Sequence, residues 1–382
     1  MKNDNYIDFI EKSRIHLNKV VFEQRIAVDE VVYALYEKTK ENKEDLSPKE
    51  ILFFIGGPSC GKRHLAQEIA KYDKSYQHFI SIDMSRFAES ESKDDLFGVM
   101  LDENGKETKY GELYKIAKEN PKSVVVFDSI EKASLKVQSI LGKILREPDN
   151  FDISFKDMLV VFTTTIGEEF YKKSIFLEHY KNDPIKAKAW IVELLGTKTI
   201  SKDNITRELF DAEILALAMH HHVVPFVELS LKVLAEIGAE SIKTLAPLFS
   251  KKLNTQLKIK SPKTIATLIT ISRFPYINAK EAKNKVPESL FYQISKFVKE
   301  KKIIPKIITV DMGETAKKFY EKNKYILNSH VSDTRSRLQS AYLTWKDDWI
   351  NEDMVMILEN VEFQKTLNNK LYEYGQKPRI RT

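Results

Sequence analysis

The stretch Gly56-Gly57-Pro58-Ser59-Cys60-Gly61-Lys62-Arg63 decides how this sequence is interpreted. It fits the phosphate-binding pattern G-x-x-x-x-G-K-[ST] at Gly56, Gly61 and Lys62, but it departs from it at Arg63, where a Ser or Thr hydroxyl normally holds Mg²⁺. The apolar run 51–55 predicts a buried strand before it, and residues 64–69 predict a helix after it. Such a turn directs backbone N–H groups and a helix N-terminus at an anion. The sequence therefore predicts a nucleotide site with an altered metal-binding position.

The composition indicates a globular protein with a sizeable core. The chain has 382 residues, of which 42% are hydrophobic and 30% charged, and this length predicts two or three domains. No apolar run is long enough to span a bilayer, and no signal segment is expected at the N-terminus. The single cysteine excludes an intrachain disulfide framework and predicts a reducing, cytoplasmic environment. A net charge of +6 is mild and does not favour nucleic acid as a partner.

Apolar strands alternate with helices along the first half of the chain. This pattern predicts a parallel sheet that is covered on both faces. Beyond residue 227 the pattern becomes largely helical, with a late strand within 303–310 and two more helices after 325. Residues 84–112 are polar and predict loops. The other expected elements are strands at 79–83, 123–128 and 158–163, and helices at 6–39, 112–119 and 130–146.

The run Ser123-Val124-Val125-Val126-Phe127-Asp128-Ser129-Ile130-Glu131-Lys132-Ala133 resembles the Walker B region of Clp-type AAA+ unfoldases and disaggregases. Three more segments resemble parts of that family's C-terminal ATPase ring, in the same order. Val21-Phe22-Glu23-Gln24 is similar to its Val-Ile-Gly-Gln segment near the adenine, and 163–167 to its sensor-1 segment. Residues 274–280 are similar to its sensor-2 segment, with Lys280 as the basic residue. The resemblance runs from about residue 20 to about residue 320.

This resemblance implies the domain organisation and the ligand. It implies an α/β AAA+ domain with a P-loop and a parallel sheet over 1–226, a small helical lid domain over 227–324, and a helical C-terminal extension over 325–382. The implied ligand is ATP or ADP. Its implied binding residues are Val21, Phe22, Gly57, Pro58, Ser59, Cys60, Gly61, Lys62, Arg63, His64, Asp128 and Lys280.

The departures from the family fall on residues that the chemistry needs. Arg63 replaces the hydroxyl that binds Mg²⁺, so the sequence gives no clear support for this metal. Ser129 replaces the Walker B glutamate that activates water, and Thr165 replaces the sensor-1 asparagine. Leu217 stands at the arginine-finger position, and no Arg lies between 208 and 222. The expected pore loop, 101–105, has no aromatic residue to grip a polypeptide. Three features of the family's site remain, namely Lys62, Asp128 and the basic sensor-2 residue Lys280.

These losses predict a hydrolysis-deficient protein. Loss of a general base costs about 10²–10⁴ in rate, and loss of an arginine finger about 10³–10⁵. The chain is therefore interpreted as a degenerate, pseudo-ATPase member of the family that binds ATP or ADP structurally and acts through a protein partner or an AAA+ oligomer. One alternative is an active ATP-dependent unfoldase or remodelling chaperone, with Glu131 or Asp83 replacing the lost glutamate. A second is a nucleic-acid-associated AAA+ factor.

Several residues keep a structural interpretation beside the functional one. Asp128 fits a strand-end carboxylate paired with Lys62 or Arg63, and Lys280 fits an ordinary surface lysine. Cys60 fits a small loop residue better than a redox switch, and His220–His222 fit a strand edge better than a metal site. The C-terminal face either packs on the chain's own body or docks a partner. Its residues are Leu338, Tyr342, Trp345, Trp349, Met354, Leu358 and Val361.

Overall fold

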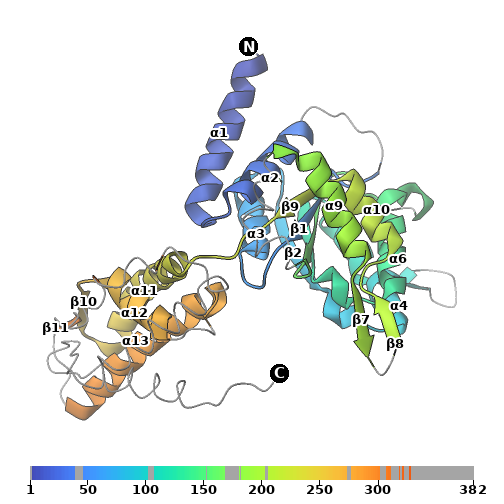
Figure 1. Cartoon of the computed structure of the whole chain (residues 1–382). Helices are drawn as coiled ribbons and strands as arrows, with labels where there is room; N and C mark the ends of the chain where they lie inside the picture. Colours follow the sequence, from blue (N-terminus) through green and yellow to red (C-terminus); the bar gives the residue numbers. More distant parts are fainter. Residues whose placement is uncertain are drawn as a thin grey trace. The chain divides into compact units, whose positions relative to one another are not determined.

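The computed structural model describes residues 2–38, 46–101, 107–151, 153–167, 182–202, 205–272, 277–301 and 307–310, with positions 180, 318, 321 and 327. The chain divides into two units, 1–227 and 228–382 (Figure 1). Most of the predicted pore loop, the start of the predicted sensor-2 segment and the C-terminal face lie outside the described residues.

A five-stranded parallel sheet forms the centre of the first unit, as the sequence predicts. Its strand order is β2-β5-β6-β1-β9. The strands are β1 (Glu50–Ile55), β2 (His78–Asp83), β5 (Ser123–Asp128), β6 (Leu159–Thr164) and β9 (His222–Pro225). All four strands expected from apolar runs are present within one residue of their expected limits, and β9 adds the edge strand next to the histidine run.

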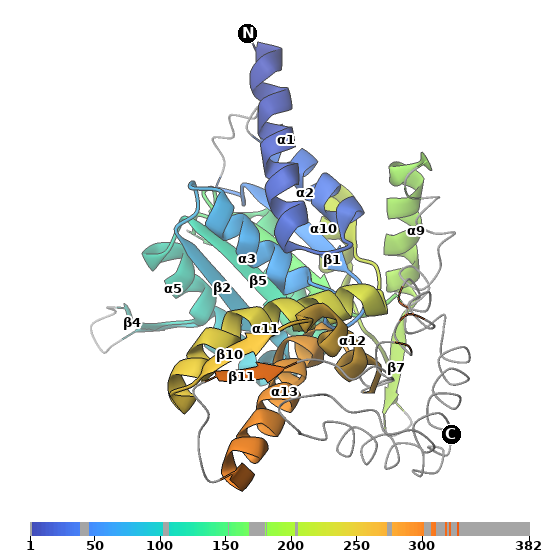
Figure 2. The same cartoon turned by 90° about the vertical axis from the view of Figure 1, so that its left-hand side faces the viewer.

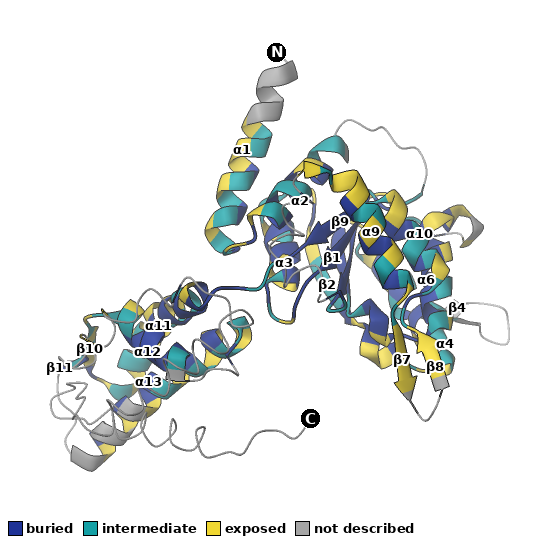
Figure 3. Ribbon diagram, in the orientation of Figure 1, coloured by how far each residue is buried: buried dark blue, intermediate teal, exposed yellow. Residues whose placement is uncertain are grey.

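Helices cover both faces of this sheet (Figures 1 and 2). Every residue of β1 is buried, and its side chains alternate between two cores. Phe53 joins the core formed with α5, α6, α9 and α10, and Phe54 joins the core formed with α1, α2 and α3. Figure 3 shows the buried strands between more exposed helices. The helices are α1 (Lys2–Val20), α2 (Arg25–Lys38), α3 (Lys62–Tyr72), α5 (Glu112–Glu119), α6 (Leu135–Arg146), α9 (Pro184–Gly196) and α10 (Ala212–His220).

The single helix expected over 6–39 is wrong, because the chain breaks at 21–24 between α1 and α2. Val21 is buried there, and Glu23 adopts a left-handed backbone with φ 58°. The side chain of Gln24 donates to the carbonyl of Val227 and accepts from its N–H, both at 2.9 Å. This contact joins positions 203 residues apart, so the local sequence pattern gives no sign of it.

The polar regions between strands contain more structure than the sequence indicates. Residues 84–112, expected as loops, contain an antiparallel pair of strands whose connection spans most of the predicted pore loop. A second antiparallel pair follows α9. These elements are α4 (Lys93–Phe97), β3 (Val99–Leu101), β4 (Glu107–Tyr110), β7 (Thr199–Lys202) and β8 (Ile205–Glu208), with short 3₁₀ turns at Met84–Phe87, Ser90–Ser92, Ile130–Lys132 and Pro148–Phe151.

The second unit is mainly helical, with one parallel pair of strands, β10 and β11. The late strand expected within 303–310 is present as β11, whereas β10 was not expected. Pro287 inside α13 has no N–H for the carbonyl of Lys283, and the Ser241 hydroxyl of α11 donates to that carbonyl at 2.6 Å. Of the helices described in the whole chain, none is long and apolar enough to cross a membrane. The elements are α11 (Leu231–Leu253), β10 (Gln256–Ile259), α12 (Pro262–Ser272), α13 (Ala279–Lys301) and β11 (Ile307–Val310).

The backbone of Glu23 gives a test of the break between α1 and α2. A left-handed conformation costs about 1–2 kcal/mol for a residue with a Cβ, and glycine avoids most of this cost. We expect Glu23→Gly to be about 0.5–1 kcal/mol more stable than Glu23→Ala in urea unfolding. Both variants remove the carboxylate, so the difference isolates the backbone. Equal stability of the two variants would contradict the left-handed assignment.

Candidate nucleotide-binding site

The phosphate-loop sequence follows β1 and leads directly into α3. A Cβ on Gly56 would lie 2.6 Å from the Cβ of Phe226, so only glycine fits at this position. Gly61 has φ 106° and precedes the helix, where a left-handed backbone again favours glycine. Ser59 also has a positive φ, 57°. Glycine is therefore required at these two positions for different reasons. Gly56 makes a close contact with Phe226, and Gly61 has a left-handed backbone conformation.

The ammonium group of Lys62 is held inside this loop. Its Nζ donates to the carbonyl of Gly56 at 2.5 Å and to that of Gly57 at 2.7 Å, and Cys60 Sγ lies 3.8 Å away. The residue is only 8% exposed. Within the part of the chain that the structure describes, Lys62 forms no ion pair. An ammonium has three donors, and these bond to the two carbonyls and to the thiol sulfur of Cys60, which is a weak acceptor. An anion would therefore take the donor that now bonds to the thiol.

The segment expected near the adenine lies beside the loop. Val21 is buried, and its Cγ1 would lie 3.9 Å from a Cβ on Gly61. Phe22 is half-buried next to it. The ring of His64, at the start of α3, makes a 3.0 Å hydrogen bond with the carbonyl of Val20. The structure therefore brings Val21 and His64 to the same end of α3 as the phosphate loop.

The remaining loop side chains differ in exposure. Pro58 and Arg63 are exposed and Ser59 is half-buried. The guanidinium of Arg63 lies 6.0 Å from the centre of the Phe79 ring on β2, within the range of a cation–π contact, and it does not fill the loop. Cys60 is 3% exposed, and burial raises the pKa of its thiol. A higher pKa leaves less thiolate, which supports the structural interpretation of Cys60.

The side chain of Thr163, on β6, links its own strand to the end of the neighbouring strand β5. Its hydroxyl donates to Asp128 Oδ1 at 2.6 Å and accepts from the N–H of Ser129 at 2.9 Å. Ser129, at the position of the family's glutamate, has a left-handed backbone with φ 61°. The described partner of Asp128 is thus Thr163, and the pairing with Lys62 or Arg63 that the sequence left open is not present among the described contacts. The sequence placed Thr163 in the sensor-1 segment but gave no sign of this bond.

Two further carboxylates near this edge are also held by hydroxyl groups. Glu131 Oε1 accepts from the N–H and the hydroxyl of Thr165, at 3.2 and 3.0 Å. Asp83 accepts from the N–H and the hydroxyl of Ser85, at 3.0 and 2.7 Å. The bond with the Ser85 hydroxyl, more than any other contact, lowers the pKa of Asp83. Both candidate replacements for the lost glutamate therefore already have partners within the chain.

Two other predicted positions lie away from the loop. Leu217 is 3% exposed and belongs to the core under α10, so nothing at this position reaches a neighbouring molecule. Lys280 is exposed on the first turn of α13, in the second unit. His221 bonds to Glu50 at 3.2 Å and His222 begins β9, and no metal-like group of three His, Cys, Asp or Glu occurs within the described residues.

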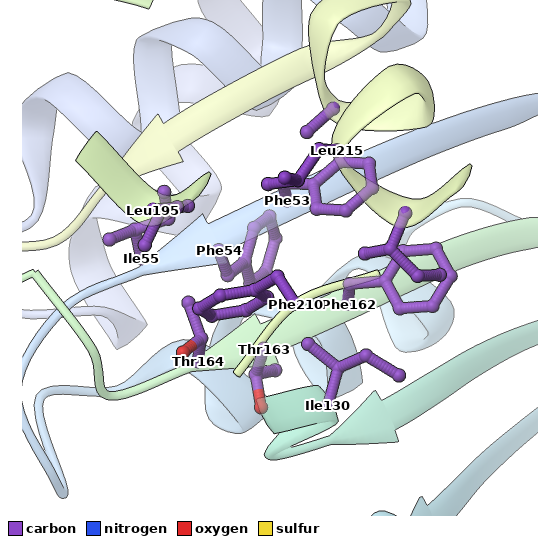
Figure 4. A pocket seen from close by; sticks show the side chains of 12 residues that line it. Phe53, Phe54, Ile55, Ile130, Phe162, Thr163, Thr164, Leu195, Phe210 and Leu215 are labelled. Atoms are coloured by element: carbon purple, nitrogen blue, oxygen red, sulfur yellow. The ribbon is translucent and has the colours of Figure 1, made fainter. Parts of the chain in front are cut away.

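A small apolar pocket lies between side chains of β1, β6 and α10 (Figure 4). Its volume of about 10 Å³ is near the minimum for one water molecule. The side chains around it are mostly those of the core between β1, β6 and α10, which makes it a packing gap and not a ligand site. Its lining residues are Phe53, Phe54, Ile55, Ile130, Phe162, Thr163, Thr164, Leu195, Phe210, Ile214, Leu215 and Ala218.

Comparison with known proteins agrees with this geometry. Residues 47–206 match the family described as AAA domain (Cdc48 subfamily). The chaperone protein ClpB of Lactiplantibacillus plantarum is 32% identical over 161 residues, which cover 40% of this chain and 18% of the relative. ClpB of Staphylococcus epidermidis is 31% identical over 173 residues, or 44% of this chain and 19% of the relative.

The chain is a Clp-type AAA+ family member. The assignment made from the Walker and sensor segments is therefore confirmed, as is the α/β AAA+ fold. The AAA match spans 47–206, a shorter region than the resemblance from about 20 to 320. The matched regions span about a fifth of the length of these relatives.

The bond between Thr163 and Asp128 can be tested by substitution. Thr163→Val keeps the shape of the side chain but removes the hydroxyl, so it leaves Asp128 Oδ1 and the N–H of Ser129 without this partner. We expect a loss of about 1–3 kcal/mol in the free energy of unfolding. Thr163→Ser keeps the hydroxyl and is the matched control. A Val variant as stable as the Ser variant would show that the bond does not contribute.

Proposed function

We propose that this AAA+ protein binds ATP or ADP without hydrolysing it and acts through contacts with other proteins. The observation that carries this proposal is that the carboxylates beside the loop are hydrogen-bonded to hydroxyl groups of the chain. Asp83, Asp128 and Glu131 each accept a hydrogen bond from a hydroxyl of the chain itself, while Ser129 stands where the water-activating glutamate belongs. A general base must reach the proton that it removes; Ser129 has no carboxylate, and one oxygen of each neighbouring carboxylate is held by a hydroxyl of the chain.

The residues of the loop support nucleotide binding. Lys62 is buried, oriented by two carbonyls and not paired with a carboxylate among the described residues. Backbone N–H groups of the loop and the N-terminus of α3 add positive potential. Val21 and Phe22 would border the base. The nucleotide supplies the anionic phosphates that balance the ammonium.

Magnesium is not required by this proposal. Arg63 has no oxygen to coordinate the metal, and Oδ1 of Asp128 is bound by Thr163. In active family members Mg²⁺ neutralises part of the phosphate charge. Here the Arg63 guanidinium would neutralise it, after moving away from the Phe79 ring. Lys280 remains a proposed phosphate sensor of the second unit, which would act as the lid over 227–324.

Protein contacts are the proposed output. The curated relatives are named chaperones, although the matched regions span only about a fifth of their length. A buried Leu217 cannot donate to the nucleotide of a neighbouring subunit, so any oligomer of this chain would lack that arginine. The partner is proposed to be a protein or another AAA+ subunit in the cytoplasm. The nucleic-acid-associated AAA+ factor stays the second alternative from the sequence, and none of the contacts described above favours it.

A second candidate is an active remodelling ATPase that uses Glu131. Glu131 is 7% exposed, and its Oε2 has no hydrogen-bond partner in the described structure. This oxygen is the one feature that favours the candidate. The bonds from Thr165 to Oε1 oppose it, because they fix the carboxylate on the sensor-1 segment.

Catalysis gives the first test. We expect no Mg²⁺-dependent ATP turnover above background from the purified full chain, and no difference between the wild type and Lys62→Ala. A rate that disappears in Lys62→Ala would contradict the proposal. If Glu131→Gln abolished that rate as well, the second candidate would replace it.

Ligand binding gives the second test. ATP or ADP should raise the thermal stability, since a ligand at 100 times its Kd adds about 2.7 kcal/mol to the native state. The shift should persist in EDTA and disappear in Lys62→Ala. Arg63→Thr restores the family's hydroxyl and is expected to make the shift depend on Mg²⁺. No shift at millimolar nucleotide would mean that the loop is kept only for the fold.

A further inference from the structure

The second unit carries a strong excess of positive charge. Between residues 228 and 310 there are sixteen Lys and Arg but only six Asp and Glu. The whole chain has a net charge of +6, so the rest of it is slightly negative. Most of the described lysines of this unit are exposed. A surface of this kind attracts an acidic partner.

Two exposed leucines lie within this basic surface, near the end of α11. Leu245 is 37% and Leu248 is 65% exposed. Lys252 follows Leu248 by four residues, so the three side chains share one face of the helix. Phe249 stacks on Phe291 of α13 with ring centres 4.5 Å apart, while its neighbour Leu248 is directed away from that contact. The result is an apolar pair bordered by positive charge at the helix end, which we call the α11 face (Leu245, Leu248, Lys251, Lys252).

One segment of the same chain has the complementary pattern. Residues 347–362 contain six acidic residues and no basic residue. Ile350, Met354, Leu358 and Val361 recur at intervals of four, four and three, which predicts the apolar face of a helix. This segment thus offers a hydrophobic stripe with negative charge along it, which matches both features of the α11 face.

We propose that residues 347–362 dock on the α11 face of their own molecule. Ile350 lies 23 residues beyond Leu327, the last residue that the structure describes, which is buried. A chain of this length reaches at most about 80 Å, and α11 is about 35 Å long at 1.5 Å per residue, so the segment can reach the α11 face. Because the segment belongs to the same molecule, docking is intramolecular and modest contacts suffice. Docking covers the two leucines and places carboxylates beside Lys251 and Lys252.

Disulfide trapping in the full chain tests this proposal. In a Cys60→Ala background, Leu248→Cys is combined with Met354→Cys and exposed to mild oxidation. The matched control is Lys232→Cys with Met354→Cys, because Lys232 is exposed on the same helix, about 24 Å from Leu248 along its axis. We expect an internal disulfide in the monomer that forms at least tenfold faster at 248 than at 232. Circular dichroism confirms that both variants fold.

The charge contribution has its own control. Lys251→Glu with Lys252→Glu should slow trapping at 248 by about fivefold, while Lys232→Glu should leave it unchanged. A disulfide between two molecules would overturn the proposal in favour of a second copy as occupant. Equal trapping at 248 and 232, or none at either, would also overturn it, because it would show that the segment has no preferred place on the unit.

Discussion

The close approach of Gly56 to Phe226 is the constraint on which the first unit depends. β1 is buried on both faces, and at its end the N–H of Phe226 donates to the carbonyl of Ile55 at 2.7 Å. A side chain at 56 would collide with Phe226. The missing Cβ lets the chain after the edge strand β9 meet the start of the loop. The Gly56 carbonyl then holds Lys62, so one glycine fixes the sheet edge, the loop and the lysine together.

Beside the loop, the ends of β5 and β6 show how the structure holds Asp128 and Ser129. In the parallel pair of β5 and β6, Phe127 is opposite Phe162, so the next residues, Asp128 and Thr163, also lie side by side. The Thr163 hydroxyl satisfies the aspartate and the N–H of Ser129 at once. A half-buried carboxylate without a partner would cost stability. The hydroxyls therefore have a structural role that does not depend on hydrolysis.

The sequence predicted those parts of the fold that depend on local pattern. Apolar runs predicted four strands because a buried parallel strand must be apolar on both faces. The glycines of the motif predicted the loop because residues with a Cβ rarely fit its close contacts and backbone conformations. The break at 21–24 was missed because a contact with Val227 produces it. The short hairpins were missed because their strands are only three or four residues long and carry no clear hydrophobic alternation. At the site, motif positions located Lys62 and Asp128, but the bonds of Thr163 and Thr165 depend on strand register and backbone turns that spacing does not reveal.

The buried lysine itself is an argument for an anionic ligand. An ammonium that is 8% exposed and that bonds to two carbonyls and a thiol bears a desolvation cost that these neutral partners offset in part. If the loop served only the fold, a neutral side chain of similar length would fill the same space at a lower cost, since replacing buried charge by apolar groups is often neutral or stabilising. A phosphate group changes this balance, because it gives the ammonium a charged acceptor in place of the weakly accepting thiol. The burial of Lys62 therefore supports the part of our proposal that concerns nucleotide binding.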